Sequence, residues 1–261
     1  MNHERDGGAD RIGLHAGRGD AMQPAMQPAV AVTALFTGPV KPLARPGHPP
    51  VPSGIAKSAQ AGPVRLYVTG FEGDEQGDRI YHGGPDKAVH HYPSEHYVMW
   101  RMRFPGSPVT LAAGAFGENV STTGMTEQNV CIGDTYRVDT ALLQVSQGRQ
   151  PCWKLNRRLD HPEAAFIVQQ SGATGWYYRV LESGVLARGD RLVLLERPCP
   201  DWPLARLIGA LFPNAANPAI LRAEWRAAAA LGPLSANWRQ TFLRRAESGL
   251  VEDWGRRLIE T

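Results

Sequence analysis

The sequence predicts an α+β protein, mainly β, in which a barrel-like domain precedes a small bundle of three helices. Two observations support this fold class. Between residues 29 and 197, short apolar runs are separated by Gly and Pro and partly alternate with polar residues, which is typical of half-buried strands joined by turns. Few helical segments interrupt these runs, so we expect a mostly antiparallel sheet curled into a barrel. After residue 200, apolar residues recur at helical spacing instead.

The first 28 residues are predicted to form a disordered extension. They combine Gly, Asp, Arg and Gln with the short repeat MQPAMQPA, and this composition buries too little apolar surface to offset the entropy lost on ordering. Acidic residues interrupt the stretch and no apolar core follows at once, so we do not expect a secretory signal peptide.

Five apolar runs predict the strands of the β-domain, residues 29–197. In chain order they are AVAVTALF (29–36), VRLYVTGF (64–71), NVCIGDTYRV (129–138), ALLQVSQ (141–147) and RLVLLE (191–196). Their Val, Leu, Thr and Tyr content favours strands over helices. Helical segments are predicted between them at about 94–103, 152–159 and 162–171.

The region 201–261 is predicted to be a three-helix domain. Asp201 is the expected N-cap of a helix through Phe212, Asn217 with Pro218 opens a second helix, and Ser235 opens a third. Apolar stripes at this period usually pack against other elements. We therefore interpret the bundle as a docking or dimerisation module, which makes a homodimer one expected assembly.

Composition excludes several classes of protein. Lys and Arg total 28 against 25 Asp and Glu, a net charge of +3, which is too small for a dedicated duplex nucleic acid binder. No stretch approaches the roughly 20 apolar residues that span a bilayer, so no membrane partner is expected. The three cysteines lack CxxC spacing, which argues against a disulfide framework or structural zinc and favours a reducing, cytoplasmic location.

The segment QVSQGRQPCWKLNRRL, residues 144–159, is the most informative one. An apparent strand ends in a polar loop, and Pro151 then opens a helical pattern that places Cys152 in the first turn. The positive end of a helix dipole and four nearby cations favour thiolate, so Cys152 is a candidate nucleophile or soft-metal ligand. These cations are Arg149, Lys154, Arg157 and Arg158. Cys131, inside an apolar alternation, is interpreted as a buried structural residue.

Three further segments carry polar groups suited to a ligand. Four histidines, His82, His90, His91 and His96, lie between residues 81 and 97, where Gly83 and Gly84 predict a turn that brings backbone close to a ligand. A zinc site there is the less favoured interpretation because no HExxH pattern is present. Glu118 and Asn119 can hydrogen-bond a heterocycle, although Gly-Glu-Asn also forms ordinary turns. Lys57 and Ser58 form a candidate phosphate cradle.

Four segments, in this order, resemble the MOSC domain (molybdenum cofactor sulfurase C-terminal domain) family, and in particular its YiiM-like branch. They are GFEGDEQ (70–76), HGGPDKAVHHYP (82–93), AFGENVSTTGMTEQNVCIGD (115–134) and SQGRQPCWKLNRR (146–158). The resemblance runs from about Val30 to the C-terminus. It implies a β-barrel-like domain that binds the molybdenum cofactor.

The resemblance also implies roles for single residues. Cys152 corresponds to the cysteine that coordinates molybdenum, and Lys57 with Ser58 to the position that anchors the phosphate of the pterin tail. His82, Gly83, Gly84, Glu118, Asn119 and Arg149 correspond to positions that line the cofactor pocket. His91 is preferred over His90 as a functional histidine, and Lys154 is a further candidate cofactor ligand.

The implied activity is a molybdenum-dependent two-electron reduction of N-hydroxylated substrates, such as hydroxylaminopurine bases or amidoximes, to amine and water. An imidazole of His82 or His91 is the expected proton donor. A separate flavin or iron–sulfur reductase is expected to supply electrons, because the chain has too few cysteines for a cluster and no GxGxxG segment.

Two alternatives remain open at this stage. In one, the chain carries sulfur or cofactor without turnover, and Cys152 accepts a persulfide. In the other, it binds a phosphate ester or nucleotide and Cys152 is structural.

The distribution of lysines adds one more expectation. Of only four lysines against 24 arginines, Lys57, Lys87 and Lys154 fall inside the motif segments, which indicates sites that need a compact ammonium.

Overall fold

The computed structural model describes residues 1, 29–78, 83–213 and 217–260. Nearly all of the predicted N-terminal extension, and His82, lie outside these residues. Among the helices of the described part, none is long and apolar enough to cross a membrane.

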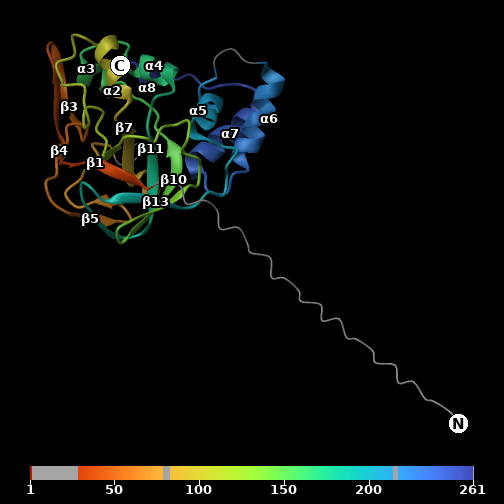
Figure 1. Cartoon of the computed structure of the whole chain (residues 1–261). Coiled ribbons are helices and arrows are strands. Elements are labelled where there is room, and N and C mark those ends of the chain that lie inside the picture. Colours follow the sequence, from red (N-terminus) through yellow and green to blue (C-terminus); the bar gives the residue numbers. More distant parts are fainter. Residues whose placement is uncertain (2–28, 79–82, 214–216, 261) are drawn as a thin grey trace.

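Seven strands of the described chain close into a barrel, which confirms the predicted fold class (Figure 1). Their order around the barrel is β13-β9-β10-β11-β7-β8-β1, and antiparallel pairing of β1 with β13 closes the circle. The bounds are β1 Val30–Thr37, β7 Val89–Pro93, β8 Val120–Thr122, β9 Thr135–Val138, β10 Ala141–Gly148, β11 Trp176–Glu182 and β13 Arg191–Glu196. The sheet is antiparallel as expected, except that β7 and β8 run parallel.

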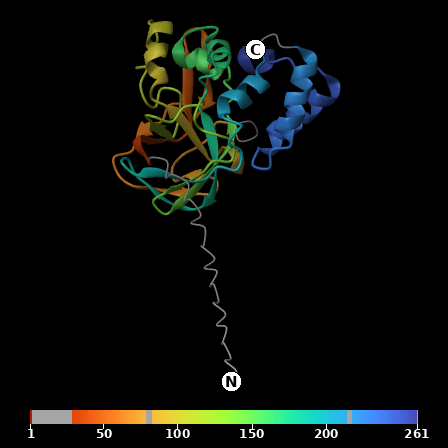
Figure 2. The same cartoon turned by 45° about the vertical axis from the view of Figure 1, so that its right-hand side comes forward.

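Shorter elements surround the barrel. They are the hairpin β2 (Lys41–Arg45) and β3 (His48–Ser53), β4 (Ser58–Ala59) beside β1, the three-stranded sheet of β5 (Val64–Tyr67), β6 (Gly70–Phe71) and β12 (Gly184–Leu186), and the 3-10 turn η1 (Pro85–Lys87). The predicted inner helices form as α2 (His96–Arg103), α3 (Lys154–Leu159) and α4 (Ala164–Ser171). Figure 2 shows these three helices grouped at one end of the barrel.

The C-terminal region forms the predicted helices α5 (Leu204–Leu211), α6 (Pro218–Ala229) and α7 (Ala236–Ser248), followed by the short α8 (Gly255–Leu258). Two predicted caps are confirmed: the Asn217 side chain accepts from Ala219 N at 2.9 Å, and the Ser235 hydroxyl accepts from Trp238 N at 3.4 Å.

The predicted Asp201 cap is wrong, because α5 begins three residues later. Backbone carbonyls of a neighbouring loop cap this helix instead. Leu204 N donates to Val130 O at 2.8 Å, and Ala205 N donates to Glu127 O at 2.7 Å. These two bonds satisfy backbone N–H groups at the start of α5. In a helix with a side-chain cap, an oxygen of the capping side chain accepts from such groups.

One hydrophobic cluster joins the barrel interior to helices α5, α6 and α7. Gly148, at the end of β10, makes this close approach possible. A Cβ atom there would lie 2.8 Å from Ile208 Cγ1 and 2.9 Å from Trp238 Cη2. A second cluster packs α2, α3 and α4 together and includes Leu258 of α8. The C-terminal helices therefore rest directly on the strand that leads to Cys152.

Candidate functional site

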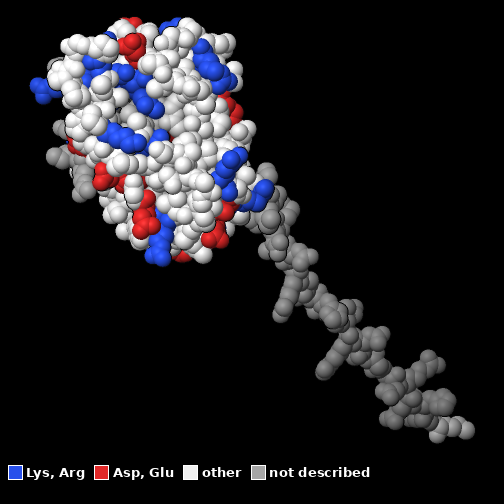
Figure 3. All heavy atoms as spheres, turned by 90° about the vertical axis from the view of Figure 1, so that its left-hand side faces the viewer, with Lys and Arg blue, Asp and Glu red and all other residues white. Residues whose placement is uncertain are grey.

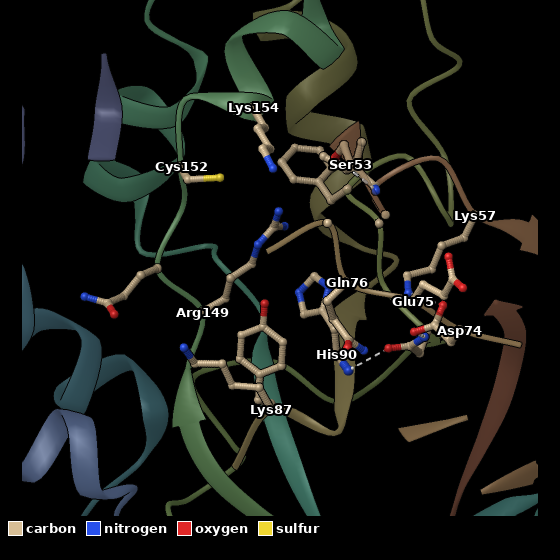
Figure 4. A pocket seen from close by; sticks show the side chains of 18 residues that line it. Ser53, Lys57, Asp74, Glu75, Gln76, Lys87, His90, Arg149, Cys152 and Lys154 are labelled. Atoms are coloured by element: carbon tan, nitrogen blue, oxygen red, sulfur yellow. Dashed lines mark hydrogen bonds and ion pairs between the residues drawn. The ribbon is translucent and has the colours of Figure 1, made fainter. Parts of the chain in front are cut away.

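Two adjoining cavities surround the segment that follows β10. The smaller has a volume of about 90 Å³ and the larger about 570 Å³. The larger lies in the range of small-molecule sites, roughly 300–1,000 Å³. Both are lined by Gly77, Lys87, Gln150, Cys152, Lys154 and Tyr177. The smaller is lined in addition by Ser53, Gly54, Ile55, Lys57, Asp74, Glu75, Gln76, His90, Phe116, Gly117, Asn119 and Arg149 (Figure 4).

Cys152 lies on the wall that the two cavities share, and its side chain is half-buried. The expectation that it occupies the first turn of a helix is wrong, because α3 begins at Lys154 with Trp153 as N-cap. Pro151 and Cys152 are irregular, and the Cys152 carbonyl accepts from Leu155 N at 2.9 Å. Cys152 is therefore placed by the chain that leaves β10 and not by a helix.

Arg149 brings a buried positive charge to the smaller cavity. Only 7% of the residue is exposed, and its Nη1 atom has no hydrogen-bond partner among the described residues. The guanidinium carbon lies 5.9 Å from the centre of the Phe116 ring. Figure 4 shows the Arg149 guanidinium pointing into the space between Lys154 and His90, with Cys152 nearby. Because a buried donor without a partner is costly, this group is suited to an anionic ligand.

His90 lines the smaller cavity, and only 5% of it is exposed. Its Nε2 atom, like Arg149 Nη1, lacks a partner in the described part of the chain. The ring centre lies 5.1 Å from that of Tyr177. Burial, and then the charge of Arg149, hold the pKa of His90 well below its usual value, so the imidazole is neutral.

The structure reverses our preference for His91 over His90. His91 is fully buried in the barrel, where Nδ1 lies 3.0 Å from Tyr178 Oη and Nε2 lies 2.9 Å from Thr122 Oγ1. The ring stacks on Trp176 at a centroid distance of 4.2 Å. Burial lowers the pKa of His91 to about 3. It lines neither cavity and has both nitrogens occupied, so it cannot act as the proton donor predicted for it.

Lys57 and Asn119 meet at the wall of the smaller cavity through Asp74. The Lys57 ammonium is paired with Asp74 Oδ1, and Asn119 Nδ2 donates to Asp74 Oδ2 at 2.9 Å. Asn119 Oδ1 accepts from His90 N at 3.0 Å. Burial lowers the pKa of Lys57, while the charge of Asp74 opposes the shift. The two predicted residues are thus brought together by a carboxylate that sequence reasoning did not single out.

Other predicted site residues lie elsewhere. Glu118 does not line either cavity; it is fully buried and accepts from Tyr97 Oη and Gly114 N at 2.6 Å each. It therefore holds the 114–118 loop in place. Ser58 is exposed and does not line the cavities. Gly83 and Gly84 precede η1 outside the lining, and Gly84 has the positive φ of 99° expected of a turn glycine.

Three of the four lysines, Lys57, Lys87 and Lys154, line the smaller cavity. Lys154 Nζ donates to Pro52 O at 2.8 Å, and burial lowers the pKa of Lys87. Figure 3 shows a group of Lys and Arg on the upper part of the face in view, with further Lys, Arg, Asp and Glu spread below it. The lining of the cavity therefore combines a free thiol with Arg149 and three lysines, of which Lys57 is paired with Asp74.

These residues fit an anionic, thiolate-binding cofactor such as the molybdenum cofactor. Arg149 Nη1 and His90 Nε2 are buried polar atoms without partners in the described chain, and both belong to residues that line the smaller cavity. Cys152 lies on the same wall and offers a thiolate. A thiolate is a soft ligand, which a metal already coordinated by sulfur readily binds. Arg149, His90 and the three lysines would hold the anionic part.

Comparisons with known proteins agree with this fold. The MOSC domain family model matches residues 78–193. Over 223 residues the chain is 39% identical to protein YiiM of Escherichia coli (strain K12), covering 79% of this chain and 90% of that protein. The crystal structure of YiiM from Escherichia coli matches with a TM-score of 0.74 at 32% identity, over 90% of this chain and 100% of that chain.

A further relative, from Gibberella moniliformis and named a reductase, is 45% identical over 153 residues, which are 58% of this chain and 27% of that protein. The relation to YiiM, by contrast, covers more than three quarters of this chain in sequence and 90% of it in structure. The chain therefore belongs to the MOSC domain family, in its YiiM-like branch.

Proposed function

We propose that this protein binds the molybdenum cofactor at Cys152 and uses it to reduce N-hydroxylated compounds to amines. The observation that carries the proposal is the pair of unpartnered buried groups, Arg149 Nη1 and His90 Nε2, in the cavity that also holds the free thiol of Cys152. Membership in the MOSC family and the relative named a reductase support it.

The reaction converts R–NH–OH, two electrons and two protons into R–NH2 and water. The bound cofactor supplies the electron pair and a site for the departing oxygen, and a separate flavin or iron–sulfur reductase restores the electrons. The residues of the chain bind the anionic cofactor, shield it and provide a proton. The larger cavity, which shares Cys152 with the smaller, has room for a substrate of nucleobase size.

Lys87 is the best-placed proton donor among the described residues. It lines both cavities, and burial lowers the pKa of its ammonium, which brings proton release closer to neutral pH. His90 lines only the smaller cavity, and its neutral imidazole is suited to hydrogen bonding instead. We therefore assign the proton-donor role to Lys87 in place of His91; His82, the other residue predicted for this role, lies outside the described residues.

The test is turnover of a hydroxylaminopurine by protein made in a host that synthesises the cofactor, with a reduced viologen as electron source. We expect the amine product from wild type and a loss of at least about a thousandfold in Cys152→Ser, the scale expected when a group essential to the chemistry is removed. Cys131→Ala, a change at a cysteine outside the cavities, is the matched control. Full turnover in Cys152→Ser would contradict the proposal, and so would an inactive wild type that contains molybdenum.

A further inference from the structure

The last segment that the structure describes, residues 254–260, is fastened to the loop that carries Cys152. We call this segment the C-terminal clasp. We propose that the clasp positions Cys152, with Arg257 as its positioning residue, so that the site is incomplete without the end of the chain. The consequence for cofactor loading rests on the proposed function, whereas the positioning itself does not.

Hydrogen bonds from the clasp hold the chain on both sides of Cys152. The Arg257 guanidinium donates through Nη1 to Pro151 O, the residue before Cys152. Trp153 N, the residue after it, donates to Arg257 O at 2.7 Å. One residue of the clasp therefore binds both neighbours of the cysteine, one through its side chain and one through its backbone.

Arg257 is itself anchored by elements outside the cysteine loop. Its Nη2 donates to Gln169 Oε1 on α4, and its guanidinium carbon lies 5.4 Å from the centre of the Phe212 ring, at the end of α5. The residue is half-buried. Arg257 thus links the cysteine loop to two helices that belong to different hydrophobic clusters.

The rest of the clasp holds α3, the helix that follows the loop. Asn156 Nδ2 donates to Leu258 O at 2.9 Å, and Leu258 is buried in the same cluster as Leu155. Arg157 is buried and forms an ion pair with Glu260, in which Arg157 Nε donates to Glu260 Oε1 at 2.8 Å. Figure 1 accordingly shows α8 beside α4.

The cysteine loop needs such support because regular structure does not provide it. Strand β10 ends at Gly148 and α3 begins only at Lys154. Between them, Arg149 N donates to Gly175 O at 2.9 Å. The backbone groups that flank Cys152, Pro151 O and Trp153 N, are both bonded to Arg257 of the clasp. The clasp also forms part of the wall of the larger cavity, through Arg256 and Arg257.

Hydrogen exchange on the cofactor-free protein tests the proposal. Trp153 N and Leu155 N are hydrogen-bonded reporters on the loop. In Arg257→Met, which removes the charge and the donors but keeps an unbranched apolar stem, we expect both amides to exchange about tenfold faster or more. Arg257→Lys, which keeps the charge but not the two-sided fork, should lie between wild type and Arg257→Met.

Arg239→Met is the matched control for general destabilisation. Arg239 is, like Arg257, a half-buried arginine of the C-terminal helices, but it donates to Ala229 O at 3.3 Å and Leu231 O at 2.9 Å, which lie outside the clasp. We expect it to change exchange at the two reporter amides by less than about twofold, while opening its own helix. Unchanged reporters in Arg257→Met would overturn the proposal, and so would equal acceleration in both variants.

Molybdenum content gives the second measurement. Protein from a cofactor-producing host should contain less metal in Arg257→Met than in Arg239→Met. If wild type contains no molybdenum, the proposed function fails, but the exchange result still decides whether the clasp positions the loop.

Discussion

Two clusters in the molecule contain the same kinds of residue, a cysteine, an arginine and a tyrosine, and differ by one carboxylate. In the first, which we call the Asp134 cluster, Arg197 donates to Asp134 through Nε at 2.8 Å and Nη2 at 2.6 Å. Asp134 is fully buried and also accepts from Cys131 N at 2.9 Å and Tyr136 Oη at 3.0 Å. Every group there has its partner inside the protein.

The second, the Cys152 cluster, has no such carboxylate on its arginine. Within the described part of the chain, Arg149 forms no salt bridge, and its Nη1 atom has no hydrogen-bond partner. Tyr177 and Cys152 complete the cluster on the cavity wall. The comparison indicates that the first cluster stabilises the fold, whereas the second is arranged for a ligand that brings its own negative charge.

The cysteines follow the same division. Burial, and then the charge of Asp134, raise the pKa of Cys131 to about 11, so this residue stays a thiol at neutral pH. It is buried, as the sequence indicated. Cys152 instead faces two cavities and several cations. The same side chain is thus inert in one cluster and available in the other.

The largest expected difference between the clusters is in stability. Arg197→Met leaves the buried carboxylate of Asp134 without its cation, and we expect a loss of about 3 kcal/mol in the free energy of unfolding. Urea denaturation of the cofactor-free protein measures it. A loss below about 1 kcal/mol would mean that solvent replaces the guanidinium.

Histidine protonation gives the next effect, because His91 is enclosed as completely as Asp134. Its folded pKa of about 3 lies below the unfolded value of roughly 6.5, so the unfolded chain binds the proton first as pH falls. His91 therefore stabilises the fold above pH 6.5, and about 2 kcal/mol of this is lost by pH 5.

His91→Gln should accordingly have a smaller loss of stability than wild type between pH 7.5 and 5, by about 2 kcal/mol. Denaturant unfolding at the two pH values gives the difference directly. Equal losses in both proteins would show that His91 becomes protonated in the folded state and is less enclosed than its two hydrogen bonds indicate.

Arg149→Met makes the same change in the Cys152 cluster. Because the guanidinium has an unpartnered donor, its removal should alter the free energy of unfolding of the cofactor-free protein by less than about 1 kcal/mol. Molybdenum content should nevertheless fall strongly. A destabilisation as large as that of Arg197→Met would mean that Arg149 has a structural role.

The smallest effect is expected at Ser58. Its side chain is exposed and lies outside the cavity lining, in contrast to Lys57 beside it. Ser58→Ala should leave molybdenum content and stability unchanged within about 0.5 kcal/mol. A clear loss of the metal would support the phosphate-anchoring role that the resemblance implies.

The fold class, most strands and two helix caps could be predicted because they depend on local patterns. Asn217 and Ser235 act through their own side chains, whereas α5 is capped by carbonyls of residues more than 70 positions earlier, which no local signal reveals. The late start of α3 was missed for a similar reason. Contacts with the C-terminal clasp hold the preceding loop out of the helix.

The site was predictable in its centre and not in its surroundings. Cys152, Arg149 and Lys154 share one segment, and the structure keeps them on one wall. His90 and His91 are neighbours on β7, so their side chains face opposite sides of the strand. Because β7 is buried on both sides, the sequence pattern does not show which of the two histidines faces the cavity. Asp74 lies in the cavity wall because the fold brings it against Lys57 and Asn119, residues distant from it in the sequence.

The most direct test of the account is the molybdenum content of three proteins purified from a cofactor-producing host: wild type, Cys152→Ala and Cys131→Ala. We expect about one metal per chain in wild type and Cys131→Ala, because a single thiolate ligand binds it, and a near-complete loss in Cys152→Ala. Wild-type metal content in Cys152→Ala, or loss of the metal in Cys131→Ala alone, would contradict the account.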